Sequence, residues 1–258
     1  DMIFNHIGSF HWWMKDLPSK DWIHQFDEFT RTNYKASTYM DPYASERDRM
    51  LMEKGWFDVT MPDLNQSNPL VETYLIQTSL WWIAFSDLDG IRMDTHPYPL
   101  PDMMARWAKR IEEEFPGFFI VGEVWYDDPA LSSYWALNKV NHDGYRSNLP
   151  SLTDLPVCFA THRAFEGKLN PTDALSKLYN VLSQDFLYPE PFRNVIFLDN
   201  HDMTRFYTQT GKSLDAYKMG LSFIMTTRGI PQLYYGTEIV MEGDKSLGDG
   251  RLRDDFPG

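Results

Sequence analysis

Short apolar runs that end in polar or charged residues recur along the chain. Four of them cover residues 90–94, 118–125, 195–198 and 230–239. Apolar runs of this length, without polar alternation, are typical of strands buried on both faces. We therefore expect strands here, and another in the apolar stub at residues 1–6, which ends in Asn5 and His6.

Helical periodicity fills the segments between these runs. In residues 69–85 apolar side chains recur at helical spacing, and Asn68-Pro69 supplies a cap and a first-turn proline. The same pattern predicts helices over residues 100–115, 172–184 and 214–229. The segment 126–192 is otherwise harder to interpret, and we expect a strand within "SLTDLPVCFA", residues 151–160.

Strands and helices that alternate along a chain imply a parallel sheet. The polar residues all follow the C-terminal ends of the strands. This favours a β/α barrel, in which the reacting groups gather at that rim. A doubly wound open sheet is the alternative. It would more often carry a glycine-rich phosphate loop, and neither GxGxxG nor GxxxxGK[ST] occurs in the sequence.

Residues 8–66 interrupt the alternation. This stretch has little periodicity, scattered proline and glycine, many charges and four tryptophans, Trp12, Trp13, Trp22 and Trp56. Unstructured loops of this length are uncommon in compact domains unless they are functional. We interpret the stretch as an irregular excursion with short elements.

The amino-acid composition excludes some classes of binding partner and favours others. The formal net charge of −13 argues against binding to nucleic acid or to anionic membranes. No apolar run approaches the roughly 18 residues of a membrane span. Aromatic residues make up 16% of the chain, which suits a ring-shaped ligand such as a sugar as well as a tryptophan-rich core. The single cysteine, Cys158, excludes an intrachain disulfide.

The polar strand ends carry the candidate chemistry. They supply three carboxylates and four accompanying polar groups: Asp94, Glu123, Asp202, Asn5, His6, Arg92 and His201. In a closed barrel these ends converge, although they lie far apart in the sequence.

Three interpretations of this set remain. A divalent metal site uses such residues, but the HxH pairs typical of metallohydrolase barrels are absent. Glycoside hydrolysis needs one ionised and one protonated carboxyl group, whose pKa values a third carboxylate and an arginine help to separate. Ordinary caps and salt bridges would explain any single residue, but they explain less well the joint occurrence at three strand ends.

The motifs themselves resemble those of the α-amylase family of glycoside hydrolases. Four short segments match the family's motifs in order: "DMIFNH" (1–6), "GIRMD" (90–94), "GEVW" (122–125) and "FLDNHD" (197–202). A fifth, "MPDLN" (61–65), resembles the extra motif near the end of the excursion that follows the third barrel strand. Five motifs in order over nearly the whole chain form a specific signal.

The resemblance implies a role for each matching residue. Asp94 would be the nucleophile, Glu123 the general acid and then base, and Asp202 the third carboxylate. Arg92 would position Asp94. The substrate-binding residues would be His6, His201, Trp125 and Arg205. The reaction would retain anomeric configuration, with the two catalytic carboxyl groups about 5–5.5 Å apart. Within the fourth motif, Asn200 is expected to fix the turn and Asp199 to be structural.

The same resemblance indicates the substrate and the subfamily. Met61-Pro62 and Trp125 resemble neopullulanases and cyclomaltodextrinases, and "DTHPYP" (94–99) resembles versions found in Bacteroidetes-type bacteria. We expect hydrolysis of α-1,4 bonds in maltooligosaccharides, cyclodextrins or pullulan, with α-1,6 cleavage left open. No cofactor is required. Whether calcium binds stays open, because the asparagine at the motif position of Asn5 serves a calcium site in only some relatives.

Measured against the family, the chain is expected to be a fragment. It would run from about strand three to strand eight of a (β/α)8 TIM barrel over residues 1–258, with the excursion at 8–66 as an inserted domain. A barrel without two strands exposes edges, so self-association is expected. The resemblance implies a periplasmic enzyme, with the cytoplasm as the alternative. The alternative functions are a transglycosylase and a non-catalytic carbohydrate-binding or partner protein of the same fold.

Overall fold

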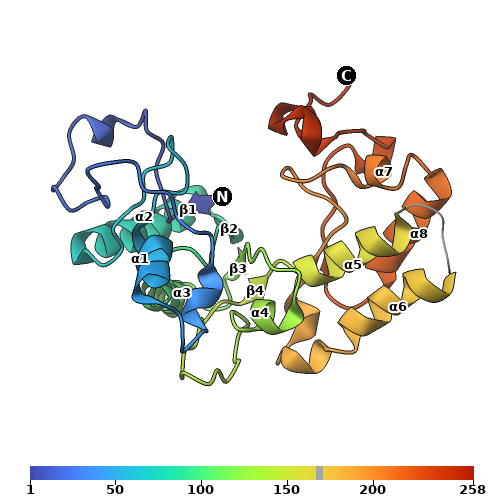
Figure 1. Ribbon diagram of the computed structural model, residues 1–258, viewed down its shortest axis with the longest axis horizontal. Coiled ribbons are helices and arrows are strands. Elements are labelled where there is room, and N and C mark those ends of the chain that lie inside the picture. Colours follow the sequence, from blue (N-terminus) through green and yellow to red (C-terminus); the bar gives the residue numbers. More distant parts are fainter. Residues whose placement is uncertain (167–170) are drawn as a thin grey trace. The chain divides into compact units, whose positions relative to one another are not determined.

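The computed structural model describes residues 1–166 and 171–258, and the chain divides into two compact units (Figure 1). The first unit contains residues 1–124 and 134–152, and the second contains residues 125–133 and 153–258. In both units the named strands pair in parallel, as the alternating sequence pattern predicts.

A four-stranded sheet with the order β1-β2-β3-β4 forms the base of the first unit. Its strands are β1 (Met2–Ile3), β2 (Gly90–Asp94), β3 (Phe119–Gly122) and β4 (Ser151–Leu152). The pairing register sets Ile3 opposite Asp94 and Met93 opposite Gly122. The C-terminal ends of the first three strands therefore lie at one edge of the sheet.

Two helices make the crossovers in this unit, α2 (Pro69–Ser86) and α3 (Pro101–Glu114). Helix α2 starts as the sequence predicts, because the Asn68 side chain accepts a hydrogen bond from the Leu70 N–H. The two helices are joined inside the core, where the Trp107 indole N–H donates to the Ser79 hydroxyl at 2.9 Å. The contact satisfies two buried polar groups at once.

The stretch from residue 8 to residue 66 folds into short elements, as expected. They are two 3-10 helices, Trp12–Met14 and Ala36–Tyr39, and α1 (Glu46–Lys54). One isolated backbone bridge, His6 to Asp63, ties the stretch to the residues after β1, and further bridges lie within the stretch. That it is an inserted domain within a single barrel domain stays a prediction.

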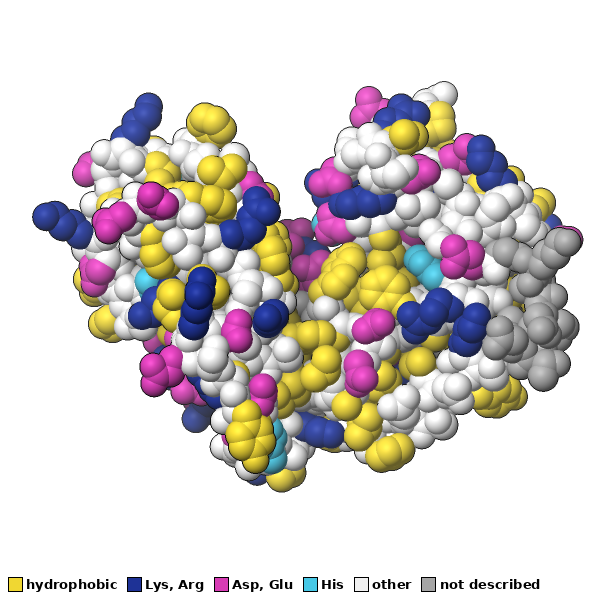
Figure 2. Space-filling model, viewed as in Figure 1, with side chains coloured by type: hydrophobic (Ala, Val, Ile, Leu, Met, Phe, Trp, Pro, Cys, Tyr) yellow, Lys and Arg dark blue, Asp and Glu magenta, His cyan; other side chains and the backbone are white. Residues whose placement is uncertain are grey.

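Strand β1 pairs with β2 on one side only among the described residues. Beside it lies a largely apolar groove of about 420 Å³, lined by side chains of β1, α2 and the excursion. Large hydrophobic side chains are exposed in both units, and some are visible among the charged groups in Figure 2. An open edge and apolar surface were expected, whereas self-association itself stays a prediction.

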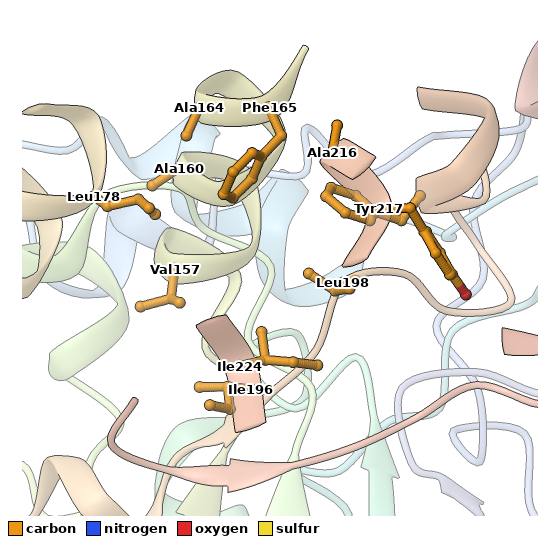
Figure 3. Packing of buried hydrophobic residues seen from close by; sticks show 11 residues of the cluster. Val157, Ala160, Ala164, Phe165, Leu178, Ile196, Leu198, Ala216, Tyr217 and Ile224 are labelled. Carbon is orange, nitrogen blue, oxygen red and sulfur yellow. The ribbon is translucent and has the colours of Figure 1, made fainter. Parts of the chain in front are cut away.

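Among its described residues, the second unit contains five helices and a two-stranded sheet. The strands are β5 (Val195–Ile196) and β6 (Ile230–Pro231), and the helices are α4 (Pro129–Ser133), α5 (Leu155–Phe165), α6 (Pro171–Leu182), α7 (Phe206–Gln209) and α8 (Leu214–Thr226). Figure 3 shows its core, where side chains of α5, α8 and β5 face one another around Ile196, Leu198 and Ile224. Five 3-10 helices complete the unit, at Asp185–Leu187, Pro191–Arg193, Thr237–Ile239, Lys245–Leu247 and Asp249–Leu252.

The strand expected within residues 151–160 is present but short. It is β4, Ser151–Leu152, and α5 begins at Leu155. The cause is local, since the Asp154 side chain caps the helix by accepting from the Val157 N–H, and a proline stands in the first turn. The expected strands at 195–198 and 230–239 also shorten to two residues each.

Within residues 1–166 and 171–258, none of the helices has the length and apolar character needed to cross a lipid bilayer.

Candidate active site

The first unit brings together four of the predicted site residues at the C-terminal edge of its sheet. Asp94 is the last residue of β2, and Glu123 directly follows β3. His6 comes three residues after β1, on the neighbouring strand. Parallel pairing in register is what brings residues 6, 94 and 123 to the same edge.

Arg92 links the two carboxylates of this edge. Its Nη1 donates to Asp94 Oδ1 at 3.0 Å, and its Nη2 donates to Glu123 Oε1 at 2.7 Å. Nη1 also reaches Asp1 Oδ1 at 2.8 Å. Arg92 and Asp94 share a face of β2 because side chains alternate along a strand. The guanidinium thus holds a nearly buried carboxylate (Glu123, 8% exposed) beside a more accessible one (Asp94, 20% exposed).

The second oxygen of Glu123 is also held. Oε2 accepts a hydrogen bond from the Thr95 backbone N–H at 2.9 Å. A Cβ at the preceding residue, Gly122, would lie 2.7 Å from Leu149 Cδ2 and 2.9 Å from the His96 ring, so a larger residue would force these side chains to move. The backbone directly before Glu123 is therefore closely packed.

An aromatic wall stands beside these carboxylates. It consists of Tyr34, Phe57 and Tyr98, whose rings meet edge to face, together with the ring of His6, which stacks on Phe57 at a centroid distance of 5.0 Å. Burial, with smaller effects from Tyr34 and the Glu123 charge, raises the pKa of Tyr98 to about 12. Burial also lowers the pKa of His6, although the Asp94 charge opposes this.

Sequence reasoning did not single out Tyr34, Phe57 or Tyr98 as site residues. Two of them belong to the excursion, whose sequence has no periodicity that would place a side chain at the strand ends. Tyr98 was noted only as part of "DTHPYP" (94–99). Its position four residues after Asp94, on the loop that leaves β2, is the signal that could have identified it.

His96 lies behind this edge, fully buried, and neither of its ring nitrogens has a hydrogen-bond partner among the described residues. Burial lowers its pKa from 6.5 to about 3. Between these two values the unfolded chain binds more protons than the folded chain, so stability is lost as the pH falls.

We expect the unfolding free energy of His96→Leu to be less sensitive to acid than that of the wild type. From about pH 6.5 to about pH 4.5 the wild type should lose about 2 kcal/mol more than the variant, because only the wild type must keep a buried imidazole neutral. Urea unfolding at both pH values measures this. Equal losses in the two proteins would show that His96 is already protonated, or exposed, in the folded state.

The second unit holds the remaining predicted residues. His201 Nε2 and Asp202 Oδ2 lie 3.0 Å apart, and Arg253 donates to Asp202 Oδ1 at 2.7 Å. Arg253 Nε also donates to the His201 carbonyl at 3.1 Å. Arg253 was missed in the sequence, since nothing in "RLRDDFPG" marks it as the partner of a carboxylate 51 residues earlier. That Asp202 shares one cleft with Asp94 and Glu123 stays a prediction.

The polar residues between β5 and Asp202 have structural roles, as expected. The Asn200 side chain accepts from the Asp202 N–H at 2.9 Å, which closes a turn of the Asx type. This hydrogen bond, rather than an unusual backbone angle, fixes the turn. Asp199 is buried and accepts from the Phe206 N–H at 2.7 Å, at the start of α7. Burial raises the pKa of Asp199.

Trp125 and Arg205 occupy different environments. Trp125 is partly exposed and meets the ring of Phe159 edge to face. Arg205 is almost completely buried, with its guanidinium 3.9 Å from the Tyr234 ring centre and Nη1 donating to the Tyr235 carbonyl at 2.7 Å. This burial favours a structural role for Arg205, and its expected reach to a further subsite stays a prediction.

In the part of the chain that the structure describes, no group of three or more His, Cys, Asp or Glu side chains is arranged to hold a metal ion. Asn5, the residue considered for calcium, is buried, and its carbonyl accepts from the Leu64 N–H at 2.9 Å. Its side-chain amide lies 3.3 Å from His6 Nδ1.

The arrangement in the first unit suits acid–base and nucleophilic chemistry on a sugar. Two carboxyl groups of unequal burial, bridged by one arginine, can take unequal protonation states. Rings beside them offer apolar faces for stacking, and His6 supplies a ring nitrogen for a hydroxyl group.

Comparison with known proteins supports this interpretation. The family model described as the catalytic domain of alpha amylase matches residues 1–255. The chain is 28% identical to a cyclomaltodextrinase of Thermoanaerobacter pseudethanolicus over 95% of its own length and 39% of the relative. It is 27% identical to an intracellular maltogenic amylase of Bacillus subtilis, over 95% of the chain and 38% of the relative.

A solved structure agrees with the sequence comparison. The structure of an alpha-amylase from Geobacillus thermoleovorans, complexed with acarbose, superposes with a TM-score of 0.79 at 31% identity. The match covers 100% of this chain and 53% of that one. The chain therefore spans about half, or less, of the length of the relatives that it matches.

Proposed function

The chain belongs to the alpha-amylase family of glycoside hydrolases, whose TIM-barrel fold class it shares, and from this premise we propose a retaining α-glucan hydrolase. One observation carries the proposal most strongly. Arg92 binds Asp94 and Glu123 at once, at the ends of two adjacent parallel strands. A retaining glycosidase needs such a pair, with one carboxylate as nucleophile and one carboxylic acid as proton donor.

In the proposed mechanism Asp94 attacks the anomeric carbon. The Arg92 guanidinium holds one Asp94 oxygen in place, and the greater exposure of Asp94 leaves its carboxylate accessible to the sugar. The glycosidic bond breaks as the glycosyl–Asp94 ester forms. The configuration inverts in this step and inverts again when water releases the sugar.

Glu123 would serve both halves of this reaction. As an acid it gives its proton to the leaving oxygen, and as a base it takes a proton from the attacking water. Its near burial disfavours the charged form, whereas the hydrogen bonds from Arg92 and Thr95 favour it. These opposing effects suit a group that must gain and lose a proton in each cycle.

The other predicted residues would bind sugar. His6 and the aromatic wall would line the cleavage position, and His201 and Asp202 would bind sugar hydroxyl groups. Trp125 would contact the leaving-group side. In this account Arg253 gives up its hydrogen bond to Asp202 when a sugar hydroxyl takes its place.

The substrate class follows from the relatives. A cyclomaltodextrinase and a maltogenic amylase support α-1,4-linked maltooligosaccharides or cyclodextrins as substrates. Cleavage of α-1,6 bonds and transglycosylation use the same residues and stay alternatives. A non-catalytic relative is disfavoured, because both carboxylates and their arginine lie in contact.

The name of the B. subtilis relative supports the cytoplasmic alternative for this enzyme. The periplasmic location and the Bacteroidetes-type origin stay predictions.

Incubation with maltoheptaose, β-cyclodextrin and pullulan tests the function. We expect maltose or maltotriose from the first two, formed first as the α-anomer in proton NMR spectra of the reaction. Accumulation of longer glucans would indicate a transglycosylase, and initial release of the β-anomer would contradict a retaining mechanism. Binding of these glucans without turnover would favour the non-catalytic alternative.

A further inference from the structure

The chain has one extra residue at the candidate active site, directly after the backbone ladder between β2 and β3. The Glu123 N–H donates to the Met93 carbonyl at 2.9 Å, and the Glu123 carbonyl accepts from the His96 N–H at 3.1 Å. If the register Met93↔Gly122 continued by one residue, Asp94 would lie opposite Glu123, and the second hydrogen bond would come from residue 95. Thr95 is thus one extra residue, here called the bulge, at the start of the turn that follows β2.

This bulge is strained. Thr95 has φ of +46°, in the left-handed region that β-branched residues rarely adopt. Its hydroxyl does not explain the conformation, because that oxygen is buried and has no hydrogen-bond partner among the described residues. Strain of this kind persists only where surrounding structure enforces it, and it concentrates at functional sites.

The bulge has a direct consequence for Glu123. Because His96 takes over the ladder hydrogen bond, the Thr95 N–H is free, and it donates to Glu123 Oε2 at 2.9 Å. In an ordinary ladder the Thr95 N–H would donate to the Glu123 backbone carbonyl. The extra residue therefore converts a backbone hydrogen bond into one that holds the carboxylate.

Other groups also act on this carboxylate. Arg92 donates to its other oxygen, and through Arg92 it is linked to Asp94. Tyr98 interacts with it electrostatically from the loop after β2. His96 packs beside the bulge but is neutral because of its burial. Thr95 holds Oε2 through a backbone N–H, which is less mobile than a side-chain donor.

We propose that Thr95 is a positioning residue for Glu123, and that the bulge exists to direct its N–H at the acid–base carboxylate. The inference rests on the proposed function of Glu123. The hydrogen bond fixes the side-chain orientation while the carboxyl group exchanges its proton, and it stabilises the ionised form in which Glu123 acts as base.

A first experiment is independent of catalysis. In the full chain with 15N-labelled threonine, the Thr95 amide proton should move downfield as Glu123 ionises. In Glu123→Gln this movement should be lost. If the Thr95 resonance shows the same pH dependence in both proteins, the hydrogen bond does not form and the inference is overturned.

A second experiment measures the effect on the reaction. Replacing the Thr95 amide by an ester removes only the N–H. The alkaline limb of the kcat/KM profile on maltoheptaose should move up by about one pH unit, and kcat should fall about tenfold, because the ionised acid loses a donor. KM should change less than kcat.

The two hypotheses fail in different ways. If the wild type cleaves no α-glucan, the proposed function fails, and the amide titration still decides whether Thr95 holds the carboxylate. If the wild type is active and Glu123→Gln is not, an unchanged pH profile of the ester protein overturns the positioning role. Should the ester protein not fold, the amide titration of wild type and Glu123→Gln decides the inference by itself, and equal pH dependence in the two proteins overturns it.

Discussion

Asp94→Asn is expected to lower kcat on maltoheptaose by at least about 10⁴-fold, because an amide cannot form the glycosyl ester. The substitution is nearly isosteric, and the amide oxygen still accepts from Arg92 Nη1, so folding should be preserved. The loss should extend to substrates with good leaving groups, such as maltosyl fluoride, because the nucleophile acts in every case.

A matched control comes from the same strand region. Asp89 is exposed and directly precedes β2, at the end opposite Asp94. Asp89→Asn makes the same chemical change and removes the same charge, so its activity should stay close to that of the wild type. If Asp94→Asn kept more than roughly a tenth of the activity, the carboxylate would not be the nucleophile.

Glu123→Ala should give a loss that depends on the leaving group. Maltoheptaose hydrolysis should fall by about 10²–10⁴-fold, because an alkoxide leaves poorly without a proton. Maltosyl fluoride needs little acid assistance, so its first step should be much less affected. The glycosyl enzyme should then accumulate, because no base activates water.

Added azide tests this second step. An anionic nucleophile needs no base and can enter the space that the side chain vacates, so azide should restore turnover and yield an α-glycosyl azide. Glu114→Ala, at the exposed C-terminal end of α3, is the control: it should keep wild-type activity on both substrates and gain nothing from azide. Equal losses on both substrates, without rescue, would show that Glu123 is not the acid–base residue.

Much of the fold could be predicted from the sequence, because the signals for its helices and strands are local. The Asn68-Pro69 start of α2, the apolar run of β2 and the periodicity of α3 and α8 need no knowledge of distant contacts. The strand expected within residues 151–160 covers only Ser151–Leu152, because the Asp154 cap and the proline that follows it start α5 at Leu155.

Features set by distant partners could not be predicted. Whether residue 95 forms a bulge depends on how the loop after β2 meets the end of β3, which only the folded sheet decides. The same holds for the burial of Arg205 under Tyr234, and for the hydrogen bond of Arg253 to Asp202. The residue types of the site could be predicted from the sequence. The hydrogen-bond donors that hold its carboxylates, such as the Thr95 N–H and Arg253, could not.

The central claim is that Asp94 carries the sugar during the reaction, and its most direct test is to trap that ester. The enzyme is incubated with a fluorinated maltosyl fluoride that forms the intermediate quickly and releases it slowly, and its peptides are then analysed by mass spectrometry. One added fluoromaltosyl mass is expected on the peptide containing Asp94, and none in Asp94→Asn. A label on a peptide without residue 94, or turnover of maltoheptaose by a wild type that never acquires the label, would contradict it.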